Sequence, residues 1–140
     1  MATDHGAIAA LQDALAAEQA ASYGYGIVGA HLTGAAFKLA SADCVVHERA
    51  RDALTRLITS FGATPQAAAA AYQLPTAVSN AADAARLAVD LELAVVASYV
   101  SLAAVPEPRL RTLAATSMQS ACVRAARWGA NSQPFPGLAK

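Results

Sequence analysis

Residues 7–25 read AIAALQDALAAEQAASYGY, and their bulky or charged side chains recur every three or four positions. Ile8, Leu11 and Leu15 mark one stripe of a helix, and the stripe continues through Glu18. This spacing is typical of a helix that packs in a bundle. A carboxylate on such a stripe must be paired, hydrogen-bonded or bound to metal, because burial of an isolated charge is costly. The stretch therefore predicts both an α-helix and a buried acidic group.

The composition favours the same fold class along the whole chain. Of the 140 residues, 56% are hydrophobic and only 14% are charged, and alanine, which favours helices, is abundant. This length predicts one domain, residues 1–140. The ten basic and ten acidic residues cancel, which argues against nucleic acid and anionic membranes as partners. We expect an all-α protein.

Periodicity and capping signals predict four long helices. They are expected at about residues 4–32, 35–61, 81–104 and 108–128, followed by a loose tail that ends at residue 140. Helices of about 25 residues are roughly 37 Å long. We therefore expect a bundle of long helices with one longer link.

The link at residues 62–80 determines the topology. Thr64-Pro65 opens and Leu74-Pro75 closes a stretch that is expected to form a short Ala-rich helix. An extended link of this length reaches roughly 60 Å, enough to run the length of the bundle and deliver the third long helix parallel to the second. Such a crossover between two hairpins predicts a ferritin-like antiparallel four-helix bundle.

Three acid–base residues, Glu18, His47 and Glu92, lie on the inward stripes of three different helices. A ferritin-like di-iron centre uses one Glu from each of two helices and a Glu-x-x-His pair from each of the other two. Three of these six ligands are present. Cys44 occupies the Glu position before His47, and the last helix offers no carboxylate or histidine. We expect a degenerate di-iron site and assign no catalytic residue.

A single divalent metal ion is the first alternative for these residues. Glu18, Cys44, His47 and Glu92 would supply four ligands resembling a zinc site. Iron, manganese or zinc bound there would make the protein a metal-dependent oxidoreductase or a metal-binding protein. The Cys-x-x-His pair that supports this alternative is a weak motif on its own.

A buried ionic cluster without any cofactor is the second alternative, and we favour it. The two carboxylates would be neutralised by histidine and arginine, while tyrosine hydroxyls donate hydrogen bonds. The predicted members are Glu18, Tyr25, His47, Arg51, Glu92, Tyr99 and Arg124.

The remaining signals concern location and surface. No secretory signal and no apolar segment of about 20 residues is present, which predicts a cytoplasmic protein that does not span a membrane. Cys44 and Cys122 are expected to be free thiols. Tyr72, Trp128 and Phe135 are expected to close the bundle ends, with a dimer contact as the alternative.

Several motifs together resemble a known family. Residues 16–26 (AAEQAASYGYG), 47–52 (HERARD), 71–75 (AYQLP), 86–92 (RLAVDLE) and 124–128 (RAARW) are similar to the actinobacterial ferritin-like domain family of unknown function. The resemblance covers nearly the whole chain.

This resemblance implies a ferritin-like four-helix bundle that associates as a homodimer and has no established activity. It also implies polar positions typical of the family at Glu18, Tyr23, Tyr25, His47, Arg51 and Glu92. The function expected from the sequence is a binding or interaction module, whose further protein or small-molecule partner is not identified.

Overall fold

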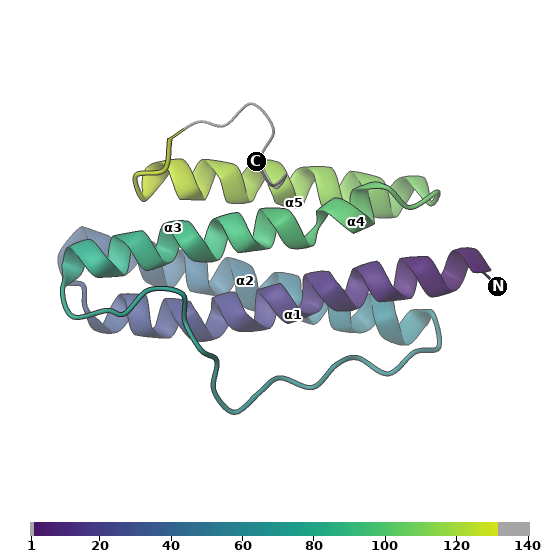
Figure 1. The fold of residues 1–140 in the computed structure, drawn as a ribbon, viewed down its shortest axis with the longest axis horizontal. Helices are drawn as coiled ribbons and strands as arrows, with labels where there is room; N and C mark the ends of the chain where they lie inside the picture. Colours follow the sequence, from purple (N-terminus) through teal and green to yellow (C-terminus); the bar gives the residue numbers. More distant parts are fainter. Residues whose placement is uncertain (1, 132–140) are drawn as a thin grey trace.

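The computed structural model describes residues 2–131, which form a bundle of four long helices and one short one (Figure 1). The helices are α1 (Ala2–Ala30), α2 (Gly34–Ser60), α3 (Ala81–Ser98), α4 (Val100–Ala103) and α5 (Pro108–Arg127). The described residues include no strand, which confirms the all-α prediction. Within the same range, no helix is both long and apolar enough to cross a membrane. Most of the predicted tail, including Phe135, lies outside the described residues.

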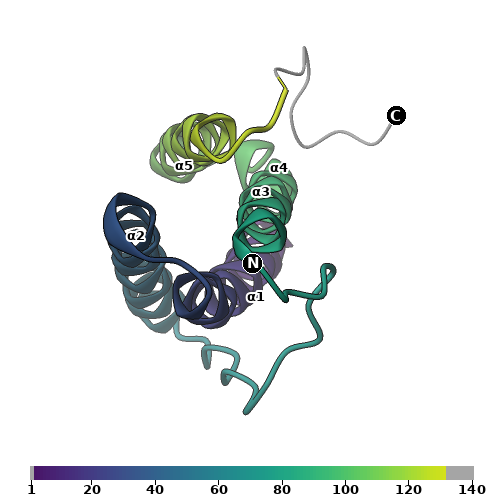
Figure 2. The ribbon, with the colours of Figure 1, turned by 90° about the vertical axis from the view of Figure 1, so that its left-hand side faces the viewer.

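The helices pack around two apolar clusters. α1 packs against α2 and α3, and α5 packs against α3 and α4 (Figure 2). One cluster includes Leu54 and Val95, and the other includes Ala40 and Leu91. Along α2, His47 lies between the residues that belong to the two clusters, and Glu92 does so along α3. A polar layer therefore separates the two parts of the core.

The link between α2 and α3 runs along the bundle from one end to the other, as the sequence predicts (Figure 1). The prediction of a short helix between Thr64-Pro65 and Leu74-Pro75 is wrong, because this segment contains no helix. Side chains of α1 hold its backbone instead. The Gln12 amide donates to the carbonyl of Thr64 and accepts from the N–H of Gln66, whose own carbonyl accepts from Gln19. These bonds satisfy backbone groups that a helix would have paired internally.

The third predicted helix is interrupted at Tyr99. α3 ends at Ser98, and the short α4 follows one residue later. The Tyr99 N–H is shared between the carbonyls of Val95 and Val96, 3.3 Å from each. Such a shared bond is common where an α-helix ends. The single long helix predicted for residues 81–104 is therefore two helices.

Side-chain caps and a glycine mark three of the helix ends. Asn80 accepts a hydrogen bond from the N–H of Asp83 at the start of α3, and Glu107 caps α5 through the N–H of Arg109. After α2, Gly62 adopts a positive φ of 76°. Gly24 permits a close approach of α3, since a Cβ there would lie 2.6 Å from a methyl carbon of Leu91.

Candidate functional site

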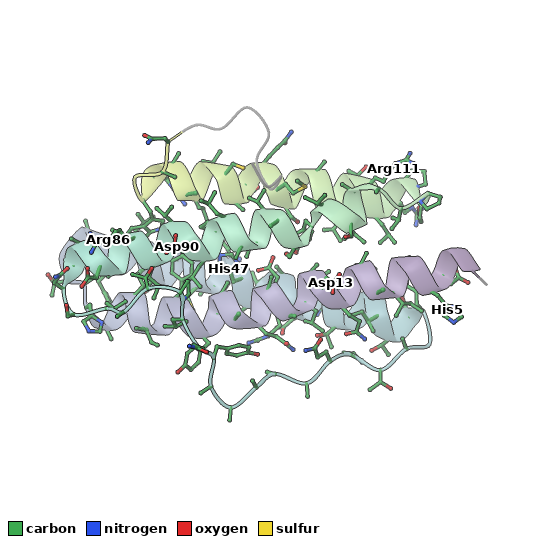
Figure 3. The ribbon with its side chains drawn as sticks, in the orientation of Figure 1. His5, Asp13, His47, Arg86, Asp90 and Arg111 are labelled. Carbon is green, nitrogen blue, oxygen red and sulfur yellow. The ribbon has the colours of Figure 1, made fainter. Side chains whose placement is uncertain are left out.

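His47 is the centre of the polar layer and is fully buried (Figure 3). Its Nδ1 lies 2.5 Å from Oε2 of Glu18, and its Nε2 lies 2.9 Å from Oε1 of Glu92. Both carboxylates are buried. An ionised carboxylate can only accept, so each ring nitrogen must donate a proton to its partner. The geometry is that of a histidine cation between two carboxylates.

Two tyrosines donate further hydrogen bonds to these carboxylates. The Tyr25 hydroxyl donates to Oε1 of Glu92 over 2.6 Å, and the Tyr99 hydroxyl donates to Oε1 of Glu18 over 2.7 Å. The Tyr25 ring also stacks on the His47 ring, with 5.3 Å between the ring centroids. Burial and the adjacent carboxylate raise the pKa of both tyrosines, so both hydroxyls stay protonated.

Arg124 connects α5 to the cluster. Its Nε donates to Oε1 of Glu92 over 2.9 Å, and its side chain is nearly buried. Burial alone would lower the pKa of Arg124, but the hydrogen bond and the charge of Glu92 raise it. All four long helices thus contribute a side chain to one network.

The charges of this network balance. Burial alone would lower the pKa of His47, but its hydrogen bonds to Glu18 and Glu92, together with their charges, raise it to about 9. Burial would raise the pKa of Glu92, but the hydrogen bonds and charges of His47 and Arg124 lower it below its usual range. Near neutral pH, two carboxylates therefore face one imidazolium and one guanidinium.

Two predicted site residues lie outside the cluster: Arg51, a predicted member of the cluster, and Cys44, a predicted metal ligand. The prediction that Arg51 belongs to the cluster is wrong. Its Nε donates to Asp52 over 3.0 Å, and its side chain is partly exposed. Arg124 already balances the charge, so a second buried guanidinium would lack a partner. The Cys44 thiol contacts the carbonyl of Ser22 at 3.6 Å and the carboxylate of Glu48 at 4.0 Å. It makes no bond to the cluster.

The donor atoms of the cluster do not fit a metal ion in this arrangement. Both nitrogens of His47 are hydrogen-bonded to carboxylates, and Oε1 of Glu92 already accepts three hydrogen bonds. Across the part of the chain that the structure describes, no group of three or more His, Cys, Asp and Glu residues is disposed to hold a metal. The arginine instead supplies the positive charge that a metal would bring.

Comparisons with known proteins give a family. The family model described as "Domain of unknown function (DUF4439)" matches residues 10–140. The chain belongs to this family. A solved structure of a conserved hypothetical protein, rv2844, from Mycobacterium tuberculosis is similar to it, with 38% identity and a TM-score of 0.84. The similarity covers 91% of this chain and 95% of that one. A search of curated proteins gave no significant match.

A second buried network in this DUF4439 chain is absent from the sequence-based prediction. The carboxylate of Asp43, which is 2% exposed, accepts from Arg127 over 3.0 Å and from the Trp128 indole over 2.9 Å. Asp43 lies four residues before His47, one turn along the inner side of α2. That spacing is the sequence signal that places Asp43 on the same inward face as His47.

Proposed function

We propose that this DUF4439 protein is a non-catalytic interaction module, built on a ferritin-like antiparallel bundle and active as a homodimer. The full-length link between α2 and α3 supports the ferritin-like arrangement. The charge balance of the buried cluster supports a bundle that needs no metal cofactor. The function then depends on the surface, and the outer side of α2 is its most distinctive part.

The outer stripe of α2 is the observation that carries this proposal. Lys38, Val45 and Asp52 are spaced seven residues apart, so they follow one another along one side of the helix. Each is roughly 140–180° around the helix from His47, which points into the core. All three are exposed. The stripe therefore has a basic, an apolar and an acidic position at equal spacing.

Exposed apolar side chains gather on the same helix. The exposed large hydrophobic residues of the described chain are Phe37, Val45 and Val46 on α2, and Val123 on α5. Phe37 borders a groove between α1 and α2 that also contains Val45 and Gly29. Exposed apolar groups next to a groove are typical of an interaction surface.

A second copy of the chain fits this stripe. When two α2 helices cross in opposite directions at Val45, the two valines meet, and Lys38 of each copy faces Asp52 of the other. The same patch then serves both subunits, as a two-fold symmetric interface requires. Lys38 has no ion-pair partner among the described residues, so it is available for this contact.

A charge-exchange experiment tests the dimer. Lys38→Glu alone places a carboxylate against Asp52 of the second copy, and Asp52→Lys alone places two ammonium groups together. Each change should weaken the homodimer roughly tenfold or more, because two pairs become repulsive at once. An equimolar mixture of the two variants should form a heterodimer. In the heterodimer both charge pairs join opposite charges, whereas in each homodimer both pairs join like charges. Sedimentation equilibrium measures all three cases.

Valine variants supply the matched control. Val45→Asp should abolish the dimer, whereas Val123→Asp, at an exposed valine on α5, should leave it intact. A parent protein that is monomeric at tens of micromolar would contradict the proposal. A dimer that is insensitive to Val45→Asp and to both charge variants would place the interface elsewhere.

A further inference from the structure

Helices α2 and α5 lie side by side (Figure 2). Side chains of both helices line a groove. Its volume is about 320 Å³. Val46 and Val123 are its apolar walls, and both are exposed. Its charged lining consists of Arg124, Arg127 and Asp43, whose carboxylate is bonded to Arg127. The groove is distinct from the outer stripe of α2.

Arg124 presents a guanidinium that is already held in place. Its Nε is bonded to Glu92, and the residue is 8% exposed. Its two terminal nitrogens have no hydrogen-bond partner among the described residues, yet they are not sealed from solvent. Arg124 lines the groove, so a ligand bound there would lie beside this residue. An anion there would bind a donor that needs no further ordering.

Arg127 adds a second guanidinium three residues later, on the same side of α5. One of its terminal nitrogens donates to Asp43, and its side chain is half-exposed. Gln119 and Ser120 line the groove one turn earlier, and neither has a side-chain hydrogen-bond partner within the described chain. The groove therefore combines two guanidiniums, each bonded to a carboxylate, with free neutral polar groups and two apolar walls.

We propose that this groove binds the carboxylate of a small organic acid whose apolar part lies against Val46 and Val123. A guanidinium matches the two oxygens of a carboxylate in geometry and in charge. Each of the two arginines already has one carboxylate partner, Glu92 or Asp43. The ligand would therefore use the remaining N–H donors rather than an unbalanced charge, and a monoanion suits the groove better than a dianion. This inference is independent of the proposed dimer.

The proposal is tested by titrating the full chain with acetate, butyrate, hexanoate and inorganic phosphate. Binding is measured from the NMR signals of the Gln119 side-chain amide and the Ser120 backbone amide. Hexanoate should bind roughly tenfold more tightly than acetate, because each buried methylene adds apolar contact. Ser120→Asp places a competing carboxylate one turn before Arg124 and should weaken hexanoate binding at least tenfold.

Thr116→Asp is the matched control, since Thr116 is exposed one turn earlier on α5 and does not line the groove. It should leave hexanoate binding unchanged. Both sites are exposed, so we expect both variants to have the melting temperature of the parent protein. That result will show that the fold is intact in each. Phosphate binding tighter than hexanoate, equal binding of acetate and hexanoate, or an unchanged affinity of Ser120→Asp would each overturn the proposal.

Discussion

Glu92→Ala should lower the free energy of unfolding by about 3–5 kcal/mol, because it leaves two buried cations with one carboxylate. Glu92 is fully buried, and its Oε1 accepts hydrogen bonds from Tyr25, His47 and Arg124. Truncation strands all three donors. Chemical denaturation near pH 7 measures the loss, and Glu48→Ala, a half-buried glutamate outside the cluster, should change stability by less than about 1 kcal/mol.

Glu92→Gln separates the charge of this residue from its hydrogen bonds. The other carboxylate oxygen, Oε2, has no hydrogen-bond partner among the described residues. A glutamine can therefore place its amide nitrogen there and keep its oxygen as the acceptor for the three donors. We expect a smaller loss for Glu92→Gln than for Glu92→Ala. A loss below about 1 kcal/mol for Glu92→Ala would contradict a charge-balanced cluster.

The stability of the protein should fall on the order of 3 kcal/mol between about pH 6.5 and about pH 9.5. The pKa of His47 is raised from 6.5 to about 9 in the folded protein. Its stabilising contribution is therefore complete below the unfolded pKa and is lost as the pH rises through about 9. This range ends before tyrosines of the unfolded chain ionise, near pH 10. Chemical denaturation at several pH values measures the decline.

Two histidine variants identify the source of this decline. His47→Gln should be less stable at the lower end of the range and should lose little more stability toward its upper end. His31→Gln, at an exposed histidine, should follow the parent over the same range. Protonation of Glu92 affects stability only at acidic pH. Its pKa is lowered in the folded protein, so its stabilising contribution is complete above the pKa of the unfolded chain and is lost as the pH falls through the folded value. A parent whose stability is constant over the whole range would contradict a protonated His47.

Helix periodicity predicts much of the site, because it reports which side chains face inward. The inward positions of Glu18, His47 and Glu92 follow from steps of three and four residues, and burial then requires partners for them. The partner of Arg51 could not be predicted in the same way. An arginine at the border of a helix face can point to a neighbour such as Asp52 or into the core. Arg51 points to Asp52 because Arg124 already occupies the position beside Glu92.

The link between α2 and α3 shows a second limit. Local propensity favours a helix in the alanine run that follows Pro65. In the structure the segment is extended, and the side chains of Gln12 and Gln19 hydrogen-bond its backbone carbonyls. These glutamines lie 52 and 47 residues away in sequence from the carbonyls they bind. Such contacts depend on the tertiary arrangement, so propensity alone gives the wrong structure. The network of Asp43 is not predictable from the sequence for a related reason, since its partners Arg127 and Trp128 lie at the end of α5.

The protonation state of His47 tests the central claim most directly. In protein labelled with ¹⁵N at histidine, we predict that both ring nitrogens of His47 carry protons near neutral pH. We also predict that one equivalent of Zn²⁺ leaves these signals unchanged, because both nitrogens are bonded to Glu18 and Glu92. A neutral ring with one unprotonated nitrogen, and a shift of that nitrogen on addition of Zn²⁺, would contradict a metal-free, charge-balanced cluster.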